Sequence, residues 1–279
     1  MDANQPIRIN VEEVIKAKLG SRSRFIPNFL LRKVESLICQ DALNDLLERN
    51  FPRRGGDFCE GVLDNLYVQT DVRGEENLPA DGRFIVASNH PLGGLDGMTM
   101  IAWLSRKYGK DVHFIVNDLL MAVEPLQECF LPINKHGKQS RGSAIGIDEA
   151  LAGNGPVVVY PAGLCSRLQD GVVADLEWNK MFVNKAIESQ RDIIPVFFDG
   201  TNSPGFYQAA SWRKRLGIKF NLEMILLPRE IFRKSGSTFT LTVGEPISWK
   251  SLKGGADAKR QAAEIRALVY GLKDKYNRK

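Results

Sequence analysis

The fold of this chain can be predicted outward from one stretch, Ser88-Asn89-His90-Pro91-Leu92-Gly93-Gly94-Leu95-Asp96-Gly97. The stretch follows an apolar run at 84–87 and precedes a helix-periodic apolar run at 98–104, which predicts a strand, a glycine-rich turn and a helix. Asp96 opens the helix, where the helix dipole favours a carboxylate. Because an aspartate near a histidine can fix its tautomer and stabilise the imidazolium, we predict that His90 is a general base oriented by Asp96.

On both sides of this turn, strand-like and helix-like patterns alternate. Strands are predicted at 68–73, 84–87, 112–116, 156–160, 193–198 and 239–243. Helices are predicted at 57–67, 98–104, 140–152, 176–190, 207–216 and 257–276, and the segment 125–132 is predicted to be irregular. The alternation predicts an α/β fold with a mostly parallel central sheet flanked by helices. Sites in such sheets lie at the carboxyl ends of strands, which is where His90 falls.

The first 55 residues are predicted to form an N-terminal helical, basic extension, and residues 56–279 an α/β domain. Asn10, followed by Glu13, fits a capping box at the start of a helical region that spans 10–50. The segment 16–33 has six cationic residues, no acidic residue and several large apolar side chains. This pattern suits a segment that lies on an anionic lipid surface. A helical hairpin packed on the main domain, with a solvated basic edge, explains the pattern equally well.

Composition limits the classes of partner. The 279 residues carry a formal net charge of +5, which favours an anionic partner such as a nucleic acid, a membrane surface or an acidic substrate. The basic residues follow no recognisable nucleic-acid-binding signature, so we expect no nucleic acid. No apolar run approaches the roughly 18 residues of a transmembrane helix. The polar N-terminus predicts no secretion signal.

Cysteine and histidine usage argues against a metal site. The four cysteines are widely spaced and form no CxxC pair, which predicts reduced thiols. None of the three histidines lies at ligand spacing from another or from a cysteine pair, so we expect no bound metal.

Four short blocks at the ends of predicted strands hold the candidate functional groups. They are the His90 turn, Leu131-Pro132-Ile133-Asn134-Lys135-His136-Gly137, Tyr160-Pro161-Ala162-Gly163-Leu164-Cys165-Ser166-Arg167 and Ile194-Pro195-Val196. Since the strands are predicted to be parallel, an α/β fold allows these blocks to meet in one pocket.

In this order the blocks resemble those of the glycerolipid acyltransferases, the bacterial lysophosphatidate acyltransferases and their relatives. Asn89-His90 with Asp96 resembles the first family block, and Ile133-Asn134-Lys135 the second. Tyr160-Pro161-Ala162-Gly163 with Ser166-Arg167 resembles the third, Phe-Pro-Glu-Gly-Thr-Arg-Ser, and Ile194-Pro195-Val196 the fourth.

The resemblance implies direct acyl transfer without a further cofactor. His90 would take the proton of an acceptor hydroxyl as it attacks a thioester on acyl carrier protein or coenzyme A. Backbone N–H groups of Gly93 and Gly94 are candidates for stabilising the oxyanion. Lys135 and Arg167 would hold a carboxylate, a phosphate or the phosphopantetheine, unless they are solvated or paired with acids. The substrate-binding residues implied are Asn89, Gly93, Gly94, Lys135, Gly163, Ser166 and Arg167.

Two departures from the family pattern bear on the acceptor. Five residues separate His90 from Asp96 where the family has four, and we expect the glycine pair 93–94 to absorb the extra residue. Ala162 and Cys165 replace a family Glu and Arg that are linked to acceptor binding. The form Asn-His-Pro-x-Gly-Gly-x-Asp-Gly also resembles a branch found in bacteria that make amino-acid lipids. We therefore favour a lyso-ornithine or lyso-glycine lipid over lysophosphatidate as the acceptor.

The resemblance implies a peripheral protein on the cytoplasmic face of a bacterial inner membrane, with an anionic membrane surface as a partner. Two other functions fit the same residues. The His90–Asp96 pair could activate water in a thioesterase-like hydrolase, or the basic surface could serve a non-catalytic lipid- or nucleic-acid-binding module.

Overall fold

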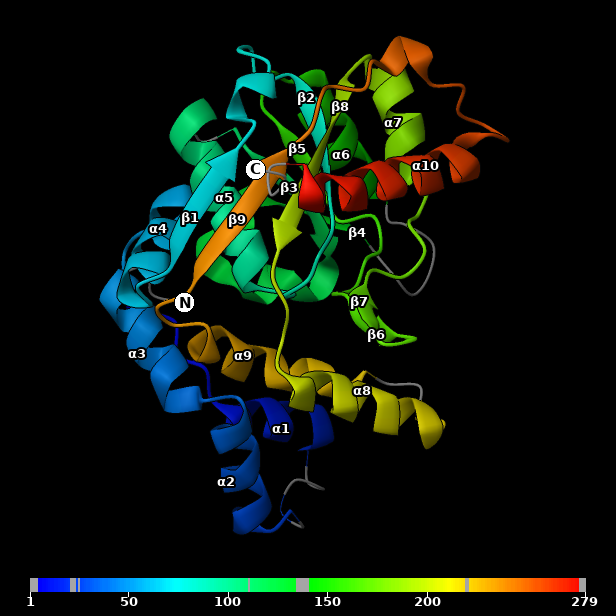
Figure 1. Ribbon diagram of the computed structural model, residues 1–279. Helices are drawn as coiled ribbons and strands as arrows, with labels where there is room; N and C mark the ends of the chain where they lie inside the picture. Colours follow the sequence, from blue (N-terminus) through cyan, green and yellow to red (C-terminus); the bar gives the residue numbers. More distant parts are fainter. Residues whose placement is uncertain are drawn as a thin grey trace.

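A seven-stranded sheet organises the chain (Figure 1). The computed structural model describes residues 5–20, 24, 26–109, 111–133, 141–218 and 221–275. The sheet has the order β1-β9-β8-β2-β5-β3-β4. Its strands are β1 (Gln69–Arg73), β2 (Phe84–Ser88), β3 (His113–Asn117), β4 (Phe130–Ile133), β5 (Val157–Val159), β8 (Asp192–Asp199) and β9 (Thr238–Val243).

The sheet is mostly parallel, as predicted. The strands β8, β2, β5, β3 and β4 all run in one direction, while β9 is antiparallel to β8, and β1 is parallel to β9. The carboxyl ends of β2 and β5, which pair directly, therefore lie side by side at one edge of the sheet. A small antiparallel hairpin of β6 (Arg167–Gln169) and β7 (Val172–Ala174) follows β5.

Two predictions for the strands were wrong. The segment 125–132, predicted to be irregular, includes most of β4, which is an edge strand where Pro132 can lack an N–H without loss of a central ladder bond. The fourth block, Ile194-Pro195-Val196, lies inside β8 and not at its end. Pro195 is tolerated there because antiparallel pairing of β8 with β9 begins only at Val196.

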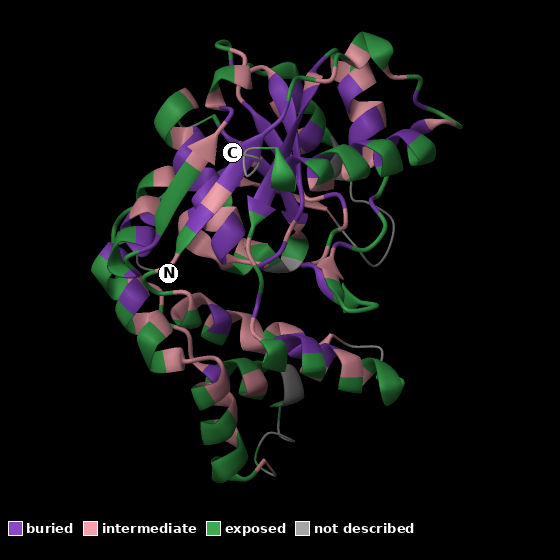
Figure 2. Cartoon of the chain, in the orientation of Figure 1, coloured by how far each residue is buried: buried purple, intermediate pink, exposed green. Residues whose placement is uncertain are grey.

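Helices cover both faces of the sheet. The first face packs against α4 (Gly55–Asn65) and α5 (Leu95–Tyr108). The second face packs against α6 (Arg141–Ala152), α7 (Met181–Ser189) and α10 (Ala258–Gly271). Alternate strand residues supply the two cores: Phe84 and Val86 pack on the first face, and Ile85 and Ala87 on the second. The central strands are accordingly buried along their length (Figure 2).

A further group of helices lies beyond the sheet edge that carries the His90 turn (Figure 1). It comprises α1 (Val11–Leu19), α2 (Asn28–Leu37), α3 (Gln40–Asn50), α8 (Pro204–Arg215), the 3-10 helix η5 (Leu222–Leu226) and α9 (Leu227–Arg233). The predicted N-terminal helices are present, and the Asn10 side chain caps α1 by accepting from the Glu13 N–H. The prediction that a domain boundary falls after residue 55 stays a prediction.

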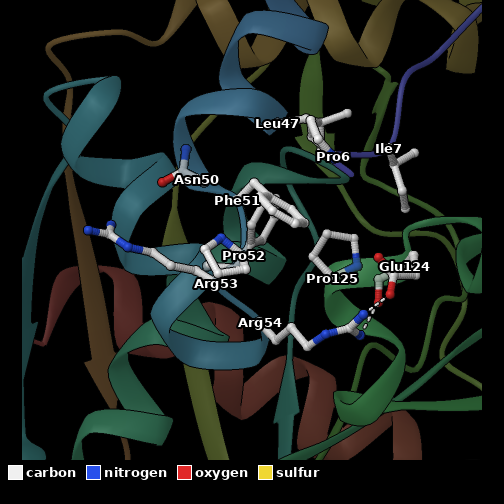
Figure 3. A pocket seen from close by; sticks show the side chains of 11 residues that line it. Pro6, Ile7, Leu47, Asn50, Phe51, Pro52, Arg53, Arg54, Glu124 and Pro125 are labelled. Carbon is white, nitrogen blue, oxygen red and sulfur yellow. Dashed lines mark hydrogen bonds and ion pairs between the residues drawn. The ribbon is translucent and has the colours of Figure 1, made fainter. Parts of the chain in front are cut away.

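The first described residues pack beside the α3–α4 connection (Figure 3). Pro6 and Ile7 line a cavity of about 60 Å³ together with Phe51 and Pro125, and an ion pair joins Arg54 to Glu124. Neither His90 nor Asp96 reaches this cavity, so it is separate from the predicted site. Within the described ranges, no helix has both the length and the apolar character needed to cross a membrane.

Candidate active site

The His90 turn holds its histidine and its aspartate together. Residues 91–94 form a bend between β2 and α5, so Asp96 lies in the first turn of that helix. His90 Nδ1 is 2.9 Å from Asp96 Oδ2. Asp96 is fully buried, whereas 17% of the His90 side chain is exposed. The longer spacing between the two residues is therefore compatible with a direct hydrogen bond.

The Asp96 carboxylate is stabilised in its charged form. Burial alone would raise its pKa, but the His90 charge, the His90 hydrogen bond and two backbone N–H donors outweigh burial, and the pKa is lowered. Those donors are the N–H groups of Leu92 to Oδ2, at 3.0 Å, and of Gly97 to Oδ1, at 2.9 Å. An ionised Asp96 can only accept hydrogen bonds, so it selects the His90 tautomer with the proton on Nδ1.

The surroundings of His90 set its pKa and the orientation of its ring. Burial lowers the pKa of its imidazole, but the charge and hydrogen bond of Asp96, with a further contribution from Asp175, leave the pKa above its ordinary value. The Tyr160 ring stacks on the imidazole, with ring centroids 4.1 Å apart and an interplanar angle of 20°. Among the described residues, no protein group bonds to Nε2. A neutral His90 therefore presents a free lone pair at the partly exposed edge of its ring.

Gly93 is required by both conformation and space. Its φ is +80°, which side-chain-bearing residues rarely adopt, and a Cβ there would lie 2.9 Å from Leu227 of α9 and 3.1 Å from Cys165. Gly94 caps α5 with φ −148°. The turn thus brings β2, the third block and α9 into direct contact. Whether the N–H groups of this turn bind an oxyanion stays a prediction.

Asn89 fixes the turn to the neighbouring strand. Its side-chain amide donates to the Phe198 carbonyl at 2.9 Å and accepts from the Phe198 N–H at 2.7 Å. The side chain is buried, so Asn89 joins β2 to β8, and its contact with substrate stays a prediction. Asn202, which follows β8, donates to the carbonyl of Pro91 and holds the turn from the other side.

Asp175 is the functional candidate that sequence reasoning missed. Its buried Oδ1 accepts from the His90 backbone N–H at 3.2 Å and from the Ser166 hydroxyl at 2.6 Å. Its Oδ2 accepts from Trp178 Nε1 at 2.9 Å. The Ser166 N–H in turn donates to the His90 carbonyl at 2.7 Å. Ser166 thus connects the third block to His90, and its contact with substrate stays a prediction.

No local pattern marked Asp175, because it lies in an irregular segment between β7 and α7. The segment between Arg167 and this residue carries no predicted strand, helix or motif, so nothing in the sequence singled the carboxylate out. Since both of its oxygens are bonded inside the fold, we assign it to positioning His90 and not to contact with substrate.

We expect Asp175→Asn to shift the pH profile of the reaction as well as to destabilise the fold. The side-chain NH₂ group of the asparagine must face an N–H or O–H group that donates a hydrogen bond to the native carboxylate. This clash of two donors costs about 1.5–3 kcal/mol of unfolding free energy. Loss of the negative charge disfavours the imidazolium, so the pKa of His90 falls. Because the base acts when neutral, the acid limb of kcat/KM should move to lower pH. A lowered melting temperature with an unmoved acid limb would leave Asp175 a purely structural role.

Arg167 is paired with an acid, which is one of the two alternatives that the sequence left open. Its Nη2 lies 2.9 Å from Glu223 Oε1, and its Nη1 donates to the Cys165 carbonyl at 2.7 Å. Arg213 of α8 pairs with the second oxygen of Glu223 at 2.8 Å. All three charges are largely buried, so Arg167 holds the third block against η5 and has no free fork for a head group.

Two more residues were predicted to bind substrate, Gly163 and Lys135. Gly163 lies exposed in the turn after β5, with φ +64° and its N–H bonded to the Tyr160 carbonyl. Lys135 falls in 134–140, outside the described residues. The structure therefore brings His90, Asp96, Gly93 and the third block together, and says nothing of the second block's cation.

Comparisons with known proteins identify relatives of this chain. A family model described as "Acyltransferase" matches residues 13–278. A lyso-glycine lipid O-acyltransferase of Phocaeicola vulgatus is 39% identical over 264 residues, which cover 95% of each chain. A protein of the same name from Bacteroides thetaiotaomicron is 38% identical and covers 95% of this chain and 97% of its own.

Among solved structures, the 1-acyl-sn-glycerophosphate acyltransferase PlsC of Thermotoga maritima aligns with a TM-score of 0.48 and 18% identity. The alignment covers 90% of this chain and 94% of that one.

Proposed function

The chain belongs to the acyltransferase family, and on that premise we propose that it transfers a fatty acyl group from a thioester to the hydroxyl of a lyso-amino-acid lipid. One observation carries the chemistry: the His90–Asp96 hydrogen bond at the carboxyl end of β2, which leaves Nε2 free to accept a proton. The two relatives named lyso-glycine lipid O-acyltransferases support a lyso-glycine lipid as the acceptor. Ala162 and Cys165, in place of a family Glu and Arg, argue against lysophosphatidate.

The proposed reaction needs no group beyond the two substrates. His90 Nε2 takes the hydroxyl proton of the acceptor while the hydroxyl oxygen attacks the thioester carbonyl. The C–S bond then breaks, the ester forms, and the imidazolium returns its proton to the leaving thiolate. General-base help of this kind contributes about 10²–10⁴ in rate. Asp96 stabilises the imidazolium throughout, because its carboxylate stays ionised beside it.

The proposal also covers the acyl donor and the cellular location of the reaction. We propose acyl carrier protein or coenzyme A as the thioester carrier and the cytoplasmic face of the inner membrane as the place of reaction. The lipid acceptor supports the second point, since a molecule with a long acyl chain is held in a bilayer. The net positive charge is in keeping with an anionic membrane surface.

A direct assay tests the acceptor and the donor together. Purified protein is mixed with a radiolabelled acyl thioester of either carrier, and with lyso-glycine lipid, lyso-ornithine lipid or lysophosphatidate in detergent micelles. We expect the acylated amino-acid lipid as the main product. Release of free fatty acid without an acylated acceptor would instead assign a thioesterase. Exclusive acylation of lysophosphatidate would overturn the choice of acceptor and leave the reaction class intact.

A further inference from the structure

Two basic, acid-free segments that are far apart in the sequence contribute helices to the same end of the molecule (Figure 1). No Asp or Glu occurs from Val14 to Val34, nor from Gly200 to Leu222. The first range includes most of α2, and the second includes all of α8 and the approach to η5. Leu37, at the last residue of α2, lines a groove together with residues of α8 and η5, so the end of α2 reaches the second region (Figure 1).

This α2–α8 surface exposes an unusual amount of apolar area. The groove has a volume of about 400 Å³, and most of its lining is aliphatic: Leu37, Leu216, Ile218, Leu222, Ile225 and Leu226. Trp212 is 61% exposed and Leu216 is 68% exposed. The helix α2 has no buried residue, and its apolar side chains Phe29 and Leu30 are 71% and 43% exposed. Exposed apolar patches of this kind mark interaction sites.

The charges around the patch identify the kind of partner. Lys214 and Arg215 are exposed in the last turn of α8, and Arg32 and Lys33 are exposed on α2. Glu223 is the first acid after the second segment, and it is buried between Arg167 and Arg213. A surface with four exposed cations, one partly buried acid (Glu35 of α2), an exposed Trp and aliphatic side chains suits the interface of an anionic bilayer. A symmetric contact between two copies would instead bring like charges together, which is unfavourable.

We propose that the α2–α8 surface docks the protein on an anionic lipid bilayer. This proposal rests on the proposed function, which requires access to an acceptor lipid held in a membrane. It also has a physical link to the active site: Glu223, which lines the groove, pairs with Arg167 of the third block, and Leu227, which follows η5, contacts Gly93. The groove and the His90 turn are thus connected through Glu223 of η5 and Leu227 of α9.

Vesicle co-sedimentation of the full chain tests the proposal. The vesicles contain phosphatidylglycerol and phosphatidylcholine, or phosphatidylcholine alone. We expect strong binding only to the anionic vesicles, weakened by salt. Trp212→Ala/Leu216→Ser and, separately, Lys214→Glu/Arg215→Glu should each lower the partition coefficient by about tenfold or more. Leu268→Ser on α10, which is 56% exposed in the native chain, and Lys250→Glu/Lys259→Glu are matched controls that should bind normally.

Two outcomes would overturn the proposal. The first is unchanged vesicle binding by both surface variants. The second is a wild-type dimer, seen by analytical ultracentrifugation, that Trp212→Ala/Leu216→Ser dissociates, because the surface would then be covered by a second copy. Activity in detergent micelles separates this proposal from the proposed function: the surface variants should acylate a micellar acceptor at the wild-type rate. Bilayer binding by a wild-type protein that acylates nothing would refute the function alone.

Discussion

Replacement of His90 by alanine is expected to lower the rate of acyl transfer by about 10²–10⁴, the range that a general base supplies. The imidazole is the proton acceptor of the proposed reaction, and among the described residues no other histidine lies at the carboxyl end of β2. Initial rates with a radiolabelled thioester and a micellar acceptor measure the loss. The substrate KM should change little, because the side chain acts on the transferring proton and not on the bulk of either substrate.

The matched control is His113→Ala. His113 lies on β3, and its Nδ1 is 3.2 Å from the backbone carbonyl of Asp111, away from the His90 turn, so the variant should keep its activity. Melting temperatures of both variants show whether the fold persists. Turnover within a few-fold of wild type in a folded His90→Ala protein would contradict the proposed mechanism. It would also remove the reason for the Asp96 and Asp175 contacts to converge on that residue.

The sequence predicted those parts of the molecule that depend on local patterns. The alternation of strands and helices follows from hydrophobic periodicity, and it placed His90 correctly at the carboxyl end of β2. The spacing of His90 and Asp96 across a glycine pair was enough to predict their contact, since both residues lie in one turn. The edge strand β4 was missed because four residues that include a proline give no clear period.

Contacts between distant segments could not be predicted. Arg167 has the same appearance in the sequence whether it binds a phosphate or Glu223, which lies 56 residues later in a segment that carried no strong pattern. The pairing of Asn89 with Phe198 depends on β2 and β8 being neighbours, and sequence order does not fix which strands pair. Asp175 gained its importance only when the fold placed it beside His90.

Asp96→Asn is expected to lower acyl transfer by about 10³–10⁴, because it reverses the tautomer of the base. In the native chain, Oδ2 accepts from both His90 Nδ1 and the Leu92 N–H, and Oδ1 accepts from the Gly97 N–H. An asparagine has one acceptor and one donor. If its NH₂ group faces Gly97, two donors oppose each other. If it faces His90, the imidazole must accept at Nδ1, and the proton moves to Nε2, which can then accept none.

The pH dependence separates this electrostatic role from simple loss of structure. In the wild type, Asp96 leaves the pKa of His90 above its ordinary value, so the rate should fall as pH drops through that raised pKa. Without the carboxylate, burial dominates and the pKa falls, so the acid limb of the residual activity should move to lower pH. Asp71→Asn, which removes an exposed acid of β1, should move neither the limb nor the rate. An acid limb that stays in place in a folded Asp96→Asn protein would mean that the limb reports a group other than His90.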